Sequence, residues 1–349
     1  MQFSTTLRRV LGAITIAAGM IGSSASHAGP SFSNLYFFGD SLSDTGNLFA
    51  ASGGFPGGPY PQSPSYFDGR FSNGPVWAEY FAGALGLSND AKAALLGGNN
   101  FAVGGDTVLP SPILRPDSTT LPIQLGLYLG ATGGIADENA LYVIMGGSND
   151  VADILATPGL SQADISSQLF NVIGALGQMV ADLYAAGAKH ILLANIPDLS
   201  DTPLVQLNPG LAPFAPGISD LSLLFAMGID IIDQNAAFAP GLDLDVLDLF
   251  GLGKAAKAGL GGFTNITDPC IDNNFAPSLN GTNNCGPLGS YDAAGHLYWD
   301  VEHPTTAAHR LIADAALNAV PLPSTLSLVL MALALTGWTL SRRRAMARF

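Results

Sequence analysis

The stretch FFGDSLSDTGN, Phe37–Asn47, passes from an apolar run into a polar turn that is rich in serine and glycine. Ser41 stands at this transition, where a serine is often only a turn former or a helix N-cap. A serine held at the rim of a sheet can also act as a nucleophile. Which interpretation applies depends on what the rest of the chain brings to the same edge.

Short apolar runs alternate with longer helical stretches along the 349 residues. The longest stretch repeats apolar residues every three or four positions, which predicts an amphipathic helix over Ser161–Ala186. Such alternation is typical of βαβ units and a mostly parallel sheet. We therefore predict one α/β domain over residues 29–320, with three α/β/α layers around a five-stranded sheet. The predicted strands are Asn34–Phe38, Asn100–Val103, Leu141–Met145, His190–Asn195 and Leu244–Phe250, and the other predicted helices are Pro75–Leu87, Leu121–Leu129, Asp220–Ala237 and Thr305–Val320.

Ligands of open parallel sheets bind outside the carboxyl ends of the strands. Ser41 lies at the end of the first predicted strand. Two more polar stretches follow the second and third strands, FAVGGDT (Phe101–Thr107) and IMGGSND (Ile144–Asp150), and WDVEHPTTAAHRLIA (Trp299–Ala313) leads into the last helix. These four stretches are expected to meet at one edge of the sheet.

The four stretches resemble blocks I, II, III and V of the SGNH/GDSL hydrolase family. The matching positions are Ser41, Gly105, Asn149, Asp300 and His303. Similarity also covers FDGRFSNGPVWAEYFA, NIPDLSDTP and GGFTNITDPC, and so extends through most of the chain. The resemblance implies a flavodoxin-like fold, membership of the secreted esterase and lipase branch, and catalysis without a metal or cofactor.

The chemistry of the residues leads to the same catalytic group. An alcohol is a poor nucleophile, so Ser41 needs a general base within hydrogen-bond reach. Among the five histidines, His303 is the best candidate, because Pro304 after it suits the first turn of a helix. Asp300 can orient the other ring nitrogen, and Glu302 is the competing carboxylate. Alternatively, Asp300 and His303 only cap a helix.

Acyl transfer also needs hydrogen-bond donors for a tetrahedral oxyanion. The backbone N–H groups of Ser41 and Gly105 are candidates, since glycine allows close backbone approach. The family resemblance implies the side-chain amide of Asn149 as the third donor. A tight turn at Gly105 and an Asx-turn at Asn149 are the structural alternatives. Three further polar residues are expected to brace the nucleophile loop: Asp40, Asp44 and Asn47.

Both ends of the chain carry features of targeting segments. Residues 1–28 have a basic start, an apolar stretch and a small-residue cleavage site, which predicts a secretory signal peptide. Residues 321–349 contain an apolar run of fifteen residues, Leu326–Leu340, followed by three arginines. This tail resembles a PEP-CTERM sorting signal, which implies an exosortase-type processing enzyme as a partner; Pro321-Leu322-Pro323 replaces the usual Pro-Glu-Pro. A plain tail anchor is the alternative, and the membrane is expected to be contacted only through this tail.

The charge and the cysteines favour an exported body. Six of the 13 basic residues lie in the two ends, whereas all 27 acidic residues lie between them. An acidic surface of this kind does not favour binding to nucleic acid. The two cysteines, Cys270 and Cys285, are expected to form a disulfide in an oxidising compartment. A metal site is the alternative, although no Cys-x-x-Cys spacing supports it.

The sequence thus predicts an exported serine esterase or lipase that cleaves carboxylic esters of small molecules, lipids or acylated sugars through an acyl-enzyme at Ser41. We expect it at the cell surface, in the extracellular matrix or secreted. The alternative is a surface-retained binding or matrix protein that uses the fold without turnover.

Overall fold

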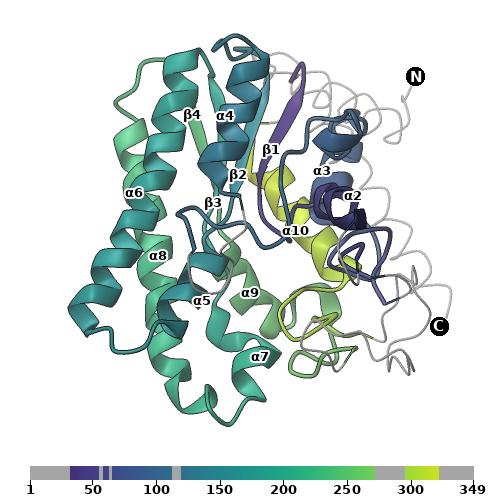
Figure 1. Cartoon of the computed structure of the whole chain (residues 1–349), viewed down its shortest axis with the longest axis vertical. Coiled ribbons are helices and arrows are strands. Elements are labelled where there is room, and N and C mark those ends of the chain that lie inside the picture. Colours follow the sequence, from purple (N-terminus) through teal and green to yellow (C-terminus); the bar gives the residue numbers. More distant parts are fainter. Residues whose placement is uncertain (1–31, 55–57, 63–64, 112–118, 272–294, 322–349) are drawn as a thin grey trace, which may run out of the picture. The chain divides into compact units, whose positions relative to one another are not determined.

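The structure is a computed structural model that describes residues 32–54, 58–62, 65–111, 119–271 and 295–321 (Figure 1). Residues Phe32–Val320 belong to one unit. The predicted signal peptide, the tail beyond Pro321 and Cys285 lie outside the described residues. The cleavage, sorting and disulfide predictions therefore stay predictions.

Four parallel strands form the sheet in the order β1 (Leu35–Gly39), β2 (Leu141–Met145), β3 (His190–Ala194) and β4 (Asp243–Leu247). All five residues of β2 are buried, as expected for a parallel strand that is covered on both faces. The register aligns the carboxyl ends of β1, β2 and β3 at one edge, so the loops that follow these strands lie side by side.

The prediction of a fifth strand over Asn100–Val103 is wrong. This segment runs along β1 and exchanges backbone hydrogen bonds of 2.8–3.2 Å with it, but it forms only an isolated bridge. Other groups bond its backbone from within the loops: the carbonyl of Asn100 accepts from Ala94 N–H and from the side-chain amide of Asn47. The segment therefore lies along the edge of the sheet and is bonded partly by side chains, without the regular backbone hydrogen bonds of a strand.

Helices follow the strands in the predicted alternation. The predicted helix Ser161–Ala186 is α6, and its buried residues are the ones that the periodicity selects. Ser161 caps it by accepting from Asp164 N–H, and Gly187 ends it with φ 113°, a left-handed conformation that glycine adopts readily. The helices are α2 Asn47–Ala51, α3 Trp77–Ala84, α4 Leu121–Ala131, α5 Ser148–Ala156, α6 Gln162–Ala186, α7 Pro203–Gln206, α8 Ala215–Ala236, α9 Leu249–Lys257 and α10 Thr306–Ala319, with short 3₁₀ turns η1 Ser52–Gly54, η2 Ala94–Leu96, η3 Leu199–Asp201, η4 Ala212–Phe214 and η5 Leu260–Gly262.

Helices cover both faces of the sheet and give the predicted three layers (Figure 1). On one face, α4, α5, α6 and α8 pack with alternate strand residues such as Tyr142 and Ile144 into one large apolar core. On the other face, α3 packs against β1 through the rings of Trp77 and Phe37, and α10 packs against α3 and β4. Within the described residues, α6 and the segment Ala212–Ala236 are long and apolar enough to cross a membrane by length and composition, and both contribute to this core.

Candidate active site

A buried carboxylate organises the loop that follows β1. Asp44 accepts hydrogen bonds from the backbone N–H groups of Gly46, Asn47 and Leu48 at 2.7–3.1 Å. It also accepts from Gly104 N–H at 2.8 Å, in the loop that follows the edge segment. Burial raises the pKa of Asp44, and the four N–H donors oppose that shift. Asp44 thereby fixes the loop of Ser41 against the Gly104–Gly105 loop.

The structure brings Ser41, His303 and Asp300 together. Ser41 Oγ lies 2.9 Å from His303 Nε2, and His303 Nδ1 lies 2.7 Å from Asp300 Oδ2. Ser41 comes from the end of β1, whereas the other two residues precede α10, and all three are buried. The arrangement is that of a nucleophile, a base and an orienting carboxylate. The carboxylate that bonds the ring is Asp300 and not Glu302.

Asp300 is held by more partners than the sequence indicated. Its Oδ1 accepts from the backbone N–H groups of Glu302 and His303 at 2.8 and 2.6 Å. Its Oδ2 also accepts from the hydroxyl of Tyr66 at 2.7 Å. Tyr66 is buried and lies 234 positions away in the sequence, so no local pattern could have identified it.

Charge pairing sets the pKa values of the pair. Burial alone would lower the pKa of His303, but the carboxylate of Asp300 outweighs it and raises the pKa. Burial alone would raise the pKa of Asp300, but the charge and hydrogen bonds of His303, with the hydroxyl of Tyr66, lower it. Burial raises the pKa of Asp40, the neighbour of Ser41, to about 7. Because the carboxylate of Asp300 raises its pKa, the ring of His303 is a stronger base than a free histidine.

Hydrogen-bond donors lie beside Ser41. Among the described residues, the backbone N–H groups of Ser41 and Gly105 have no hydrogen-bond acceptor. Gly105 has φ 86°, which favours glycine. One N–H of the Asn149 amide donates to the carbonyl of Asp106 at 2.7 Å, which fixes the side chain. All three residues line the same cavity.

The other histidines lie elsewhere. His190 pairs with Asp243 at 3.3 Å at the start of β3, and His296 bonds Asn265. His309 is buried in α10, and neither of its ring nitrogens has a hydrogen-bond partner within the described part of the chain. Burial lowers its pKa to about 3, so it is neutral. Within the described ranges, no group of three or more His, Cys, Asp or Glu side chains could hold a metal ion.

A cavity of about 750 Å³ opens above Ser41. It is lined by Ser41, Gly105, Asn149 and His303, and also by residues of α5, α7, α9 and α10. Ligand pockets of proteins fall in this range of volumes. The cavity therefore places a substrate-sized space against the Ser41 hydroxyl.

A family model described as GDSL-like Lipase/Acylhydrolase matches residues 35–316. The chain belongs to this family. The match covers both the strand that precedes Ser41 and most of α10, and so includes every residue of the site described above.

Relatives of this GDSL family member cover most of the chain. Thermolabile hemolysin of Vibrio parahaemolyticus is 28% identical over 80% of the chain and 62% of its own length. Phosphatidylcholine-sterol acyltransferase of Aeromonas hydrophila is 26% identical over 84% of the chain and 91% of its own length. Esterase EstA of Pseudomonas aeruginosa is 30% identical over 88% of the chain, which spans 50% of EstA.

Proposed function

We propose that this GDSL family member is a serine esterase or lipase that hydrolyses carboxylic esters through an acyl-enzyme at Ser41. The observation that carries the proposal is the continuous line of hydrogen bonds from Ser41 through His303 to Asp300. The names of its relatives, an esterase, a hemolysin and an acyltransferase, support a reaction at acyl esters.

The geometry supports a two-step reaction. Ser41 Oγ attacks the ester carbonyl carbon and gives its proton to His303 Nε2. The N–H groups of Ser41 and Gly105 and the amide of Asn149 stabilise the oxyanion. The tetrahedral intermediate collapses, the C–O bond to the alcohol breaks, and His303 returns the proton to the leaving oxygen. Water, activated by the same ring, then releases the carboxylic acid and restores the Ser41 hydroxyl.

Release of p-nitrophenol from p-nitrophenyl acetate by the purified full chain tests this proposal. We expect turnover by the wild type and a loss of at least about 10⁴-fold in Ser41→Ala. Ser88→Ala, which changes an exposed serine, is the matched control and should keep wild-type activity. Ser41→Ala within tenfold of wild type, with an unchanged circular dichroism spectrum, would contradict the mechanism. Stoichiometric ester binding without turnover would favour the alternative of a binding protein.

We also propose that the body is exported and that residues 321–349 act as a sorting or anchor segment. The basic and apolar start of the chain, its acidic middle and the arginine-terminated apolar tail support this. Mass spectrometry of the surface or secreted protein distinguishes the two tail hypotheses. A C-terminus near Pro323 would support processing by an exosortase-type enzyme, whereas an intact Phe349 would refute it.

A further inference from the structure

Part of the lining of the cavity comes from helices that follow the sheet. Three of these helices contribute hydrocarbon side chains, which we call the α7–α9–α10 pocket: Val205 of α7, Leu249, Leu252 and Ala256 of α9, and Leu311 and Ile312 of α10. Among the described residues that line the cavity, the ionisable acidic and basic ones are Asp40, which adjoins Ser41, and Glu302 and His303, which follow Asp300. A phosphate group would find no cationic partner there, whereas a hydrocarbon chain would lose its contact with water.

We propose that this α7–α9–α10 pocket is an acyl-chain site for unbranched acyl groups of about eight or more carbons. The inference rests on the proposed function, because the acyl group is bonded to Ser41 from the end of the first step until water releases it in the second. The alcohol leaves after the first step, so it needs a route out of the site and not a deep apolar wall. The substrate class is therefore a lipid-like ester and not an acetyl ester.

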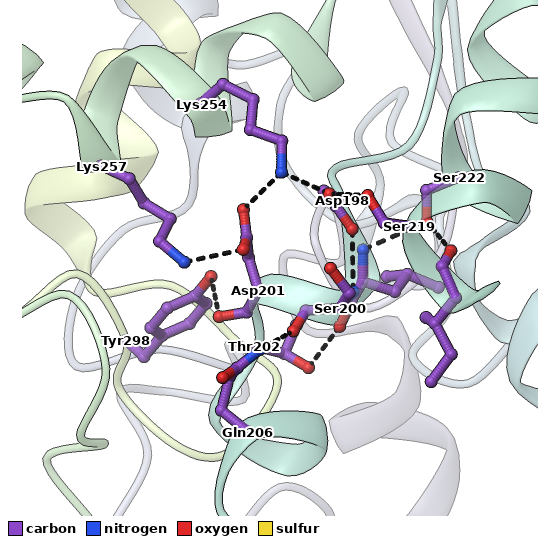
Figure 2. A network of polar contacts seen from close by, with 12 residues as sticks. Asp198, Ser200, Asp201, Thr202, Gln206, Ser219, Ser222, Lys254, Lys257 and Tyr298 are labelled. Carbon is purple, nitrogen blue, oxygen red and sulfur yellow. Dashed lines mark hydrogen bonds and ion pairs between the residues drawn. The ribbon is translucent and has the colours of Figure 1, made fainter. Parts of the chain in front are cut away.

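Two facing walls of the α7–α9–α10 pocket are tied together on their outer side. Lys254 of α9 bonds the carboxylate of Asp198 and lies 3.1 Å from Asp201, while Lys257 lies 2.7 Å from Asp201 (Figure 2). Asp198 caps η3 and Asp201 is its last residue, and η3 leads into α7. Burial raises the pKa of Asp198, but hydrogen bonds from Lys254, Ser219 and Ser200 outweigh it and hold the pKa below its usual value. These ion pairs, the Lys–Asp clamp, therefore link α9 to η3, which leads into α7.

The same wall is joined to the catalytic loop. The backbone N–H of Leu204 in α7 donates to the carbonyl of Val301 at 2.8 Å. Val301 lies between Asp300 and His303. The position of the hydrocarbon wall is thus set relative to the base and to Ser41.

Gly253 marks a place where the pocket can be filled. It lies in α9 between Leu252 and Lys254 and lines the cavity, and a Cβ atom added there would meet no atom within 4 Å. Gly174 of α6 offers a matched control, because a Cβ atom there also meets no atom within 4 Å and the residue does not line the cavity.

Hydrolysis of p-nitrophenyl acetate and p-nitrophenyl octanoate by the full chain tests the proposal. Each methylene buried in the pocket raises kcat/KM by up to about fourfold. We expect the wild-type octanoate-to-acetate ratio of kcat/KM to exceed about 10². Gly253→Phe should lower this ratio at least about tenfold, and Gly174→Phe should leave it at the wild-type value. A wild-type ratio below 1, or an equal loss of both esters in Gly253→Phe, would overturn the acyl-chain site.

Binding of octanoate, measured by calorimetry, separates this inference from the proposed function. Octanoate binding that Gly253→Phe weakens at least about tenfold would support the site even if no ester were turned over, in which case only the proposed function fails. Turnover of acetate without octanoate binding would leave the esterase and overturn the site.

Discussion

The catalytic end of the cavity and the α7–α9–α10 pocket are held in place by different forces. At the catalytic end, buried carboxylates accept directional hydrogen bonds: Asp300 has four donors and Asp44 has four. At the pocket, hydrocarbon side chains pack without directional bonds, and the Lys–Asp clamp lies near solvent, with the Lys254 side chain 46% exposed. Buried hydrogen bonds are directional and their loss is costly, whereas exposed ion pairs contribute little and are screened by salt. Changes at the two ends should therefore differ in size and in kind.

The largest effect is expected at His303 and Asp300. His303→Ala removes the base and should lower kcat/KM by about 10⁴-fold or more, and Asp300→Asn should cost somewhat less, because it misorients the ring. Both losses should be equal for acetyl and octanoyl esters, since both esters use the same chemistry. Glu302→Gln keeps the Asp300 bond and should change the rate little. A greater loss in Glu302→Gln than in Asp300→Asn would show that the carboxylate assignment is wrong.

A smaller effect, about tenfold in kcat with little change in KM, is expected for Tyr66→Phe. The variant keeps the buried ring and removes one donor from Asp300, which raises the pKa of that carboxylate. A more basic carboxylate holds the proton on His303 more firmly, so the pKa of His303 should rise further.

The pH profile of kcat/KM measures this change in the pKa of His303. On the proposed mechanism neutral His303 is the active form, and the carboxylate of Asp300 raises its pKa above 6.5. Activity should therefore fall as the pH drops through a value above 6.5. In Tyr66→Phe this limb should move to still higher pH. Tyr184→Phe is the control. The Tyr184 hydroxyl donates to the carbonyl of Pro240 and not to a residue of the site, so this variant should keep the wild-type profile. An unmoved limb in Tyr66→Phe would contradict a positioning role for Tyr66.

The smallest effect is expected from the Lys–Asp clamp. Lys257→Met removes one ion pair to Asp201, worth about 0.2–1 kcal/mol at a partly exposed site. The octanoate-to-acetate ratio should change by at most about fivefold, and 1 M NaCl should have a similar effect on the wild type. Lys189→Met is the control and should keep the ratio, because Lys189 directly precedes β3 and is not part of the Lys–Asp clamp. An equal change for both esters would mean that the clamp does not act on the pocket.

The catalytic end could be predicted from the sequence because its parts are local motifs at strand ends. Ser41, Gly105 and Asn149 each follow a strand or edge segment that the alternation of patterns located. The bounds of helix α6 were predicted to within one residue, because the sequence contains both its apolar period and its N-cap, Ser161.

The pocket could not be predicted in the same way. The predicted strand Leu244–Phe250 runs past the end of β4 into α9, because apolar residues stand on both sides of Asp248. Asp248 is the true boundary: its side chain accepts from Gly251 N–H and caps α9. Asp248 followed by two lysines in the last turn is the signal that identifies this helix. The contact of Tyr66 with Asp300 depends on tertiary packing alone.

The separation of Ser41 from His303 by 262 positions has a consequence for biogenesis. A chain is synthesised from its N-terminus at about 5–20 residues per second, so roughly 10–50 seconds pass between the synthesis of the nucleophile and that of its base. Until α10 docks beside α3, a nascent chain holds a serine with no histidine to activate it. On the proposed mechanism, such a chain hydrolyses no ester while it is being made, and a chain that ends before His303 never gains the activity.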